Sequence, residues 1–309
     1  MNNSIFIFPG QGSQKIGMGK DFYDNSSLAK EMIEKASQRV GFDFAHLLFE
    51  ENDKLDQSEY SQPAILLVSL IAHRLFVEQC KIAPKAVLGH SLGEFSAISA
   101  AGAMDYLDAV ELVHQRGLLM KQACEGINAG MMALLGLDDG TVENLTEKER
   151  ELGKKVWAAN YNGDGQIVIA GNKDDLASLE PLFKEAGAKK SVLLPMSVAS
   201  HCPLLSSAQP QLEAYLDKWL KESFLTPVIS NVTARAYQTK NEATKLLSEQ
   251  LVSPVKYKHS ILHVEETTDM FIEFGGNVLK GLNKRITSKP THSITDMKSL
   301  EEVLSLLNQ

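Results

Sequence analysis

Cysteine is scarce in this chain. Its 309 residues include three cysteines, Cys80, Cys124 and Cys202, and none of them belongs to a CxxC pair. An odd number without paired spacing indicates neither a disulfide framework nor a zinc site. We therefore expect reduced thiols, most of them buried, and no bound metal.

Long apolar runs and basic blocks are also missing. No apolar run approaches the roughly 20 residues of a membrane span, and the N-terminus lacks the features of a secretion signal. Lysine and arginine number 31 against 39 acidic residues, so the net charge is −8, which argues against binding to nucleic acid or a membrane. With 44% hydrophobic residues, we expect a folded cytoplasmic protein with a sizeable core.

The most informative stretch is residues 89–94, Gly-His-Ser-Leu-Gly-Glu, which separates a short apolar run from an alanine-rich helical pattern. Glycines two positions before and after Ser91 let a strand turn sharply into a helix, the arrangement called a nucleophile elbow. The serine Oγ then projects beside a helix N-terminus. Because a serine hydroxyl is inert at neutral pH, the elbow requires a base from elsewhere in the chain.

Alternating apolar runs and helical patterns predict an α/β fold with a mostly parallel sheet. In the larger, α/β-hydrolase-like (patatin-like) domain, strands are expected at residues 4–8, 85–89, 228–232 and 269–274, and helices at residues 27–40, 64–80 (starting after Pro63), 90–101, 106–125 (capped by Asp105), 203–222, 240–250, 277–287 and 298–308. Residues 131–194 follow a βαββαβ order, with strands at 131–135, 156–160, 166–170 and 189–194 and helices at 139–152 and 173–186. This is the pattern of a ferredoxin-like unit. We interpret residues 127–197 as this smaller subdomain, inserted between residues 1–126 and 198–309.

Histidine supplies the candidates for the base. His90 is adjacent to Ser91, but neighbouring side chains in such a turn point apart, so we expect it to line or support the pocket. His201 lies in a Ser-His-Cys-Pro turn ahead of a helix, where loop-borne catalytic groups are often placed; a structural histidine is the simpler alternative. His259 and His263 have the spacing of a metal-binding helix, but a solvated helix face is favoured because the motif's glutamate is absent.

Eight short motifs occur in order along nearly the whole chain. They are residues 10–14 (GQGSQ), 62–64 (QPA), 89–94 (GHSLGE), 115–117 (QRG), 160–162 (NYN), 197–201 (SVASH), 231–232 (NV) and 250–255 (QLVSPV). Each motif alone is weak. Together, with the βαββαβ insertion between the fifth and the sixth, they resemble the malonyl-CoA:acyl carrier protein transacylases of bacterial type II fatty acid synthesis.

This resemblance implies a ping-pong acyl transfer. Ser91 would attack the thioester of malonyl-CoA, and His201 would take its proton and then protonate the departing thiol. The main-chain N–H groups of Leu92 and Gln11 would hold the oxyanion. A main-chain carbonyl at the Gln250 segment, instead of a carboxylate, would orient the histidine. The phosphopantetheine thiol of holo acyl carrier protein would then accept the malonyl group.

The resemblance also gives Arg116 the role of holding the free malonyl carboxylate, because a guanidinium pairs with a carboxylate through two hydrogen bonds. A surface salt bridge on its helix is the alternative. Met120, one turn later, would be a wall of the same pocket or simply a core residue. Gln62, Asn160 and His90 would contribute to substrate binding. The resemblance implies no tightly bound cofactor and a monomeric enzyme.

The carrier protein is acidic in this family, so a basic patch is needed on an acidic chain. Four cations gather around the helix expected at residues 277–287 and form our docking prediction: Lys280, Lys284, Arg285 and Lys289. Lys189 and Lys190 are a second candidate. The alternative is a solvated helix face with cations near its C-terminus.

One loop departs from the family's pattern. The family usually has Gly-Pro-Gly after a glutamate and an apolar residue, whereas this chain has Gly275-Gly276-Asn277 after Glu273-Phe274. Without the proline we expect a more mobile loop with unchanged chemistry.

Three other functions use similar residues. A serine thioesterase or hydrolase would share the elbow and the histidine. A polyketide-type acyltransferase with a branched extender unit would exploit the small residues before His201. A non-catalytic scaffold would leave the intact Ser91, His201 and Arg116 unexplained. Cys202 is a further candidate nucleophile, although a buried small side chain is the simpler interpretation.

Overall fold

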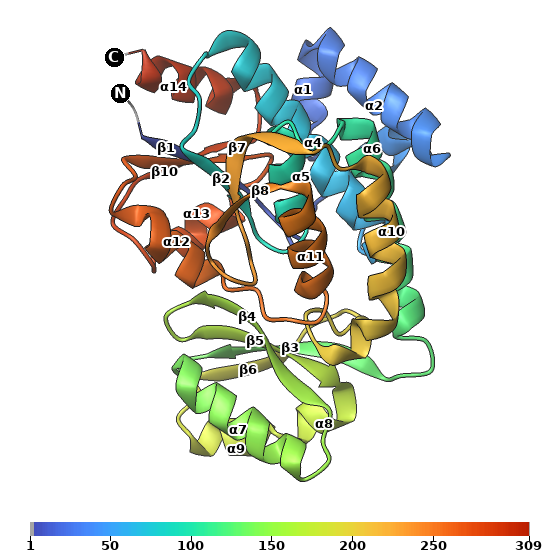
Figure 1. Cartoon of the computed structure of the whole chain (residues 1–309), viewed down its shortest axis with the longest axis vertical. Helices are drawn as coiled ribbons and strands as arrows, with labels where there is room; N and C mark the ends of the chain where they lie inside the picture. The colour runs from blue at the N-terminus through green and yellow to red at the C-terminus, as the bar shows by residue number, and fades with distance from the viewer. Residues whose placement is uncertain (1–2, 309) are drawn as a thin grey trace.

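The computed structural model describes residues 3–308 and has an α/β fold with two sheets (Figure 1). The larger sheet has the strand order β10-β9-β1-β2-β7-β8. Its paired strands are parallel except β7 and β8, which are antiparallel. The strands are β1 (Ser4–Phe8), β2 (Ala86–Gly89), β7 (Ser223–Ile229), β8 (Ala236–Thr239), β9 (Met270–Phe274) and β10 (Thr291–Ile294). The predicted α/β class with a mostly parallel sheet is confirmed.

Strand β1 lies inside this sheet, and all five of its residues are buried. Successive side chains of a strand point to opposite faces. Phe6 and Phe8 therefore join the core formed with the helices at residues 58–79, 93–100 and 106–123. Ile5 and Ile7 pack on the other face, with the helices at residues 257–265 and 278–283. The helices of this part are α1 (Lys20–Asn25), α2 (Ser27–Val40), α3 (Phe44–Phe49), α4 (Ser58–Gln79), α5 (Gly93–Ala100), α6 (Tyr106–Ala123), η1 (Pro203–Ala208), α10 (Gln209–Trp219), α11 (Lys240–Gln250), α12 (Tyr257–Glu265), α13 (Val278–Asn283) and α14 (Met297–Leu307).

The smaller sheet is antiparallel, with the order β4-β5-β3-β6, and has its helices on one face, away from the larger sheet (Figure 1). The elements are β3 (Ala129–Leu135), α7 (Asp139–Glu151), β4 (Val156–Gly163), β5 (Gln166–Asn172), α8 (Lys173–Ser178), α9 (Glu180–Glu185) and β6 (Lys190–Leu193). The predicted βαββαβ order is present. The single helix predicted at 173–186 is two helices, because Pro181 cannot donate within a helix and instead starts α9.

Helix α4 begins earlier than predicted. It starts at Ser58, and Pro63 lies inside it, so the prediction of a start after Pro63 was wrong. A proline leaves the carbonyl four residues earlier without its helical donor. That carbonyl belongs to Glu59, and the His114 ring nitrogen Nδ1 lies 2.7 Å from it. The histidine thus replaces the missing donor and lets the helix continue through the proline.

Among residues 3–308, α4 is also the one helix with the length and composition of a membrane span. In this fold 78% of its most apolar window is buried within the protein. It packs against α6, α5 and α2, so its apolar composition is accounted for by its place in the core.

Several short elements were not predicted: strands β8 and β10 and helices α1, α3 and α12. Strands β8 and β10 are edge strands with few apolar residues, AYQT and THSI, because an edge strand is only partly buried. Helix α13 is shorter than predicted and ends at Asn283. The N–H groups of Ile286 and Thr287 both bond to the Asn283 carbonyl, which turns the chain.

The loop that lacks the family's proline is closely packed. A Cβ on Gly275 would lie 2.6 Å from the Ser69 Cα, and one on Gly276 would lie 2.9 Å from the Pro9 ring. The Glu273 carboxylate before the loop accepts hydrogen bonds from the N–H groups of Leu279 and Lys280. These contacts argue against the looser loop expected from the sequence.

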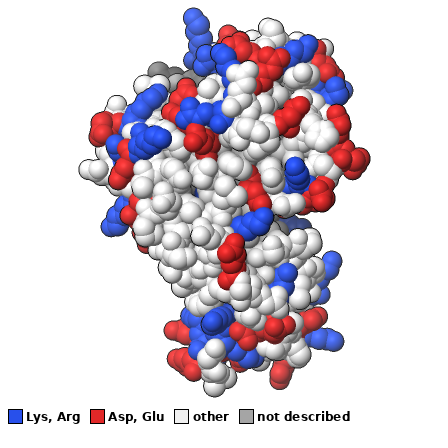
Figure 2. All heavy atoms as spheres, turned by 90° about the vertical axis from the view of Figure 1, so that its right-hand side faces the viewer, with Lys and Arg blue, Asp and Glu red and all other residues white. Residues whose placement is uncertain are grey.

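Strand β4 joins the smaller sheet to the segment between α11 and α12 of the larger part. Asn160 forms a parallel bridge with Val255, the Tyr161 N–H donates to the Val255 carbonyl, and the Val255 N–H donates to that of Ala159. The face near α10 carries positive and negative side chains interspersed, with mostly uncharged surface between the larger and smaller parts (Figure 2). No single-sign field covers this face.

Candidate active site

Ser91 occupies the turn between β2 and α5 and has a left-handed backbone, with φ of 53°. The two flanking glycines make this turn possible. A Cβ on Gly89 would lie 1.8 Å from the Gly93 backbone, and one on Gly93 would lie 2.0 Å from the Phe8 carbonyl oxygen. The chain therefore folds here as the predicted elbow, and a left-handed serine is the kind of strained residue that functional sites retain.

His201 lies in the loop before η1, also with positive φ, 62°. Its Nε2 atom is 2.7 Å from Ser91 Oγ, and its Nδ1 atom is 2.7 Å from the Gln250 carbonyl oxygen. A carbonyl only accepts, so Nδ1 carries the hydrogen and Nε2 is free to accept the serine proton. Burial, with the nearby charge of Arg116, lowers the His201 pKa to about 3. The imidazole is therefore neutral and competent as a base.

Arg116 lies on α6 with its side chain buried beside the serine. It donates to Gln62 Oε1 at 2.7 Å and to Gln250 Oε1 at 3.1 Å, and its Nη2 atom is 3.5 Å from Ser91 Oγ. The guanidinium lies over the Phe95 ring at 5.1 Å. Burial lowers its pKa to about 10, so it stays charged at neutral pH. The surface salt bridge considered as an alternative is wrong.

A network behind the serine was not predicted. The Asn231 side-chain oxygen accepts from the Ser91 N–H at 2.7 Å. The Gln250 amide nitrogen donates to the Ser91 carbonyl at 3.0 Å and to Glu94 at 2.8 Å. Tyr237 also donates to Glu94. Glu94 and Asn231 belonged to motifs in the sequence, but nothing there indicated that their side chains meet.

Two main-chain N–H groups near the serine are free. Among the described residues, neither Gln11 nor Leu92 donates its N–H in a hydrogen bond. The loop of Gln11 packs against the elbow, since a Cβ on Gly10 would lie 2.3 Å from the His90 carbonyl oxygen. The Gln11 side chain is occupied by Ser58, 3.1 Å away. Free N–H groups beside a nucleophile suit an oxyanion.

Of the other residues predicted to bind substrate, some lie beside Arg116 and others lie away from it. Gln62 bonds to Arg116, and its amide nitrogen lies 3.5 Å from the Met120 sulfur, so Met120 contacts the glutamine that holds the arginine. His90 bonds instead to Asn162 of β4 at 2.6 Å and supports the elbow from outside. Asn160 is buried in β4, where it bridges to Val255 before α12; within residues 3–308 its side chain has no hydrogen bond to the residues around Ser91.

Comparison with known proteins gives the family. Residues 5–302 match the family described as acyl transferase domain. The malonyl CoA-acyl carrier protein transacylase of Bacillus subtilis (strain 168) is 37% identical over 313 residues, covering 100% of this chain and 98% of its own length. The chain belongs to the malonyl CoA-acyl carrier protein transacylase family. It is thus an acyltransferase.

Solved structures of this transacylase family have the same fold. The malonyl-CoA:acyl carrier protein transacylase of Helicobacter pylori superimposes with a TM-score of 0.97 at 47% identity, over 100% of this chain and 99% of that one. A malonyl-transacylase solved in complex with a holo type II polyketide acyl-carrier protein has a TM-score of 0.94 at 32% identity, covering 99% of this chain and 100% of that one.

The other candidate catalytic and metal-binding residues of this acyltransferase make different contacts. Cys202 is buried with its thiol against the Ala199 carbonyl, and burial raises its pKa to about 12; it is no nucleophile. His263 contacts Arg235, and His259 lies 3.8 Å from Asp139. Among residues 3–308 no three metal-ligating side chains gather around a shared position.

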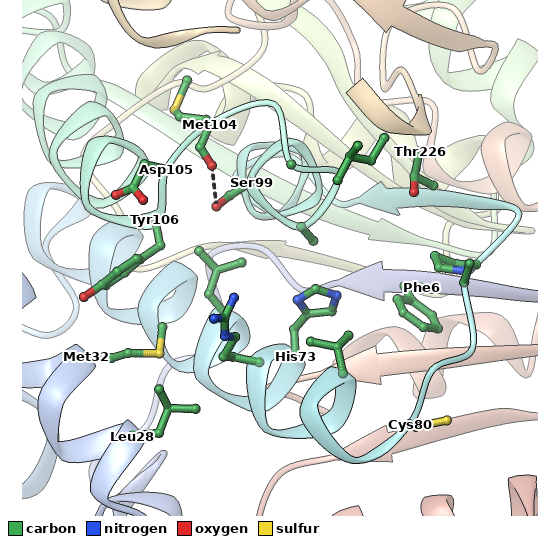
Figure 3. Close-up of a pocket in the computed structure, with 18 of the residues that line it drawn as sticks. Phe6, Leu28, Met32, His73, Cys80, Ser99, Met104, Asp105, Tyr106 and Thr226 are labelled. Atoms are coloured by element: carbon green, nitrogen blue, oxygen red, sulfur yellow. Dashed lines mark hydrogen bonds between the residues drawn. The ribbon is translucent and has the colours of Figure 1, made fainter. Parts of the chain in front are cut away.

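A cavity of about 680 Å³ lies away from the serine, between α2, α4 and the turn after α5 (Figure 3). His73 points into it from α4, near Phe6, and Tyr106 lines its other side. Neither Ser91, His201 nor Arg116 lines this cavity. The acyl-transfer site and this cavity are therefore separate.

The predicted docking cations lie beside the β4–β5 hairpin. Lys284 and Arg285 are exposed just after α13, and Arg285 donates to Gln166 of β5 at 3.0 Å. Lys280 and Lys289 are partly buried. The cluster lies beside the same hairpin whose Asn162 contacts His90, so it borders the segment that supports the elbow.

Proposed function

We propose that this acyltransferase moves the malonyl group from malonyl-CoA to the phosphopantetheine thiol of acyl carrier protein, in fatty acid biosynthesis. The observation that carries this is Arg116. Its charged guanidinium is buried 3.5 Å from Ser91 Oγ, and its hydrogen-bond partners are two glutamines and the serine; among residues 3–308 no carboxylate contacts it. A buried cation without a contacting anion favours an acyl group that brings its own carboxylate.

In the first half-reaction Ser91 Oγ attacks the thioester carbon while its proton moves to His201 Nε2. The negative charge that develops on the carbonyl oxygen is held by the N–H groups of Leu92 and Gln11. The carbon–sulfur bond then breaks, and the imidazolium returns its proton to the leaving thiolate. The products are malonyl-Ser91 ester and free coenzyme A.

The second half-reaction runs the same steps in reverse with another thiol. His201 takes the proton of the phosphopantetheine thiol, the thiolate attacks the ester carbon, and the serine oxygen leaves with that proton. Because the Gln250 carbonyl fixes the tautomer of His201 without adding a negative charge, the ring can act as base and acid in turn. Neither step requires a tightly bound cofactor.

The basic cluster Lys280, Lys284, Arg285 and Lys289 is our candidate surface for the acidic carrier protein. Support comes from its exposed cations and from its position beside the hairpin of Asn162. Electrostatic complementarity of this kind raises the rate of encounter between partners. We infer a cytoplasmic monomer.

The chain is best divided into a patatin-like domain of residues 1–126 and 198–309 and a ferredoxin-like subdomain of residues 127–197. Supporting this, one buried cluster has all its members between Met132 and Phe183, apart from the core of the larger sheet. The elbow at the end of a parallel strand supports the patatin-like assignment.

A polyketide-type acyltransferase is the second candidate, because a relative at 32% identity was solved with a type II polyketide acyl-carrier protein. Thioesterase activity is the third. In the test, wild-type protein is incubated with malonyl-, methylmalonyl- and acetyl-CoA, and the acyl adduct on Ser91 is measured by mass spectrometry before and after addition of holo carrier protein. A malonyl adduct that persists in water and discharges to the carrier supports the transferase; rapid loss in buffer alone contradicts it.

A further inference from the structure

Glu94 is a fully buried carboxylate in the first turn of α5. It accepts three hydrogen bonds: from the Asn231 N–H at 3.0 Å, the Tyr237 hydroxyl at 2.9 Å and the Gln250 amide at 2.8 Å. All three partners donate, an arrangement that suits an ionised carboxylate, which has only acceptors. Burial opposes this and raises the Glu94 pKa to about 7. A buried carboxylate that is ionised requires a nearby cation to offset its charge.

The cation is Arg116, and the Gln250 amide lies between the two charges. The amide nitrogen donates to Glu94, while the amide oxygen accepts from Arg116 Nη2 at 3.1 Å. If the amide were turned over, its NH2 group would face the guanidinium, donor against donor. The carboxylate, with the Ser91 carbonyl, which also accepts from the amide nitrogen, therefore determines which end of the amide faces the arginine.

We propose that Glu94 is a positioning residue that sets the acyl preference by holding the Gln250 amide oxygen toward Arg116. This rests on the proposed function, in which the acyl group carries a carboxylate. Direct contact between Glu94 and Arg116 would form an internal ion pair that competes with the substrate. With the Gln250 amide between them, Glu94 offsets the positive charge of Arg116 and fixes the orientation of the guanidinium. The guanidinium is then left to contact the carboxylate of the substrate.

The test is Glu94→Gln, measured as kcat/KM for malonyl-CoA and for acetyl-CoA. The new amide is neutral. Even when its oxygen faces Gln250 and its nitrogen faces the Tyr237 hydroxyl, which can accept, the hydrogen bond from the Gln250 amide loses its charge assistance, so the hold on Gln250 is weakened. Loss of a hydrogen bond to a charged group corresponds to about tenfold or more. We expect the preference for malonyl-CoA over acetyl-CoA to fall by about that factor, while Ser91 reacts with a neutral ester within about threefold of wild type.

Tyr237→Phe is the matched control, because it removes one donor to the same carboxylate and leaves the Gln250 contact intact; it should keep the wild-type preference. Gln250→Met is the second variant, which removes the connecting amide while Glu94 remains, and it should reproduce the loss. Should Glu94→Gln fail to fold, Gln250→Met decides.

Retention of the malonyl preference in Glu94→Gln overturns the inference, as does an equal loss toward malonyl-CoA, acetyl-CoA and the neutral ester, which is the signature of general disruption. A wild-type protein without a malonyl preference would instead contradict the proposed function. The two failures are therefore distinguishable in one assay.

Discussion

The His201 ring nitrogen Nδ1 lies 2.7 Å from the main-chain oxygen of Gln250, where many serine enzymes place a carboxylate. The ring is thus oriented by a neutral group. Burial, Arg116 and His90 all lower its pKa, and the hydrogen bond to the Gln250 carbonyl raises it by less. The basicity of His201 is therefore low in the free enzyme.

This arrangement predicts that the rate of acylation of Ser91 changes little as the pH is lowered below 7. With a His201 pKa of about 3, the base stays neutral down to pH 5. A histidine of ordinary pKa would be almost fully protonated at pH 5 and lose about 30-fold in rate. We expect less than about a threefold decline between pH 8 and pH 5 in acylation by a neutral ester, measured by stopped flow. A midpoint near 6.5 would contradict the assignment.

Removal of the arginine should change selectivity more than stability. In Arg116→Ala the malonyl carboxylate loses its buried partner, so kcat/KM for malonyl-CoA should fall by at least about 100-fold, with a smaller change for acetyl-CoA. Arg74→Ala is the matched control, since Arg74 is an exposed arginine of α4 paired with Glu78. An Arg116→Ala protein that still prefers malonyl-CoA would contradict the proposal that Arg116 binds the malonyl carboxylate.

Charge reversal tests the docking surface. The double variant Lys284→Glu/Arg285→Glu should raise the KM for holo carrier protein about tenfold at low ionic strength, because both cations are exposed, and should leave the KM for malonyl-CoA unchanged. Lys298→Glu, an exposed lysine at the start of α14, is the control. Equal KM values for the carrier protein in both variants would remove the proposal.

His73 predicts acid sensitivity independent of catalysis. Its ring lies among Phe6, Phe8 and Phe274, and burial lowers its pKa to about 4. The folded protein therefore binds fewer protons than the unfolded chain between pH 6.5 and 4, so the free energy of unfolding falls as the pH is lowered through this range. The contribution of His73 to that fall is at most about 3 kcal/mol.

Urea unfolding of His73→Leu at pH 7 and pH 4.5 measures this contribution. The variant should lose less stability than wild type on acidification, whereas His46→Gln, at an exposed position of α3, should follow wild type. An unchanged pH dependence in His73→Leu would show that other groups dominate acid unfolding.

Local rules were enough to predict the elbow and most of the long elements. Gly89 and Gly93 are required because any side chain would overlap neighbouring backbone, and that requirement is visible as a motif. Asp105 was predicted to cap α6, and its carboxylate accepts from the Leu107 N–H at 2.9 Å. Such features depend on residues a few positions apart, which the sequence displays directly.

Contacts between distant segments could not be predicted from residue patterns. Ser91 and His201 are 110 positions apart, and only the resemblance to a family brought them together beforehand. The start of α4 was missed because the donor that replaces Pro63 comes from His114 on another helix. Glu94 and Tyr237 meet across 143 positions. In each case the tertiary fold supplies the partner.

The contacts of β4 with the larger part of the chain constrain how the inserted segment can be exchanged. Asn162 holds His90 beside the nucleophile, and two residues earlier the same strand bridges to Val255. A segment from a relative grafted in place of residues 127–197 would therefore have to match the host at both points. Residues 127–197 therefore cannot be exchanged freely between relatives. A replacement that lacks either contact would alter the surroundings of Ser91, although Ser91 itself lies outside the exchanged segment.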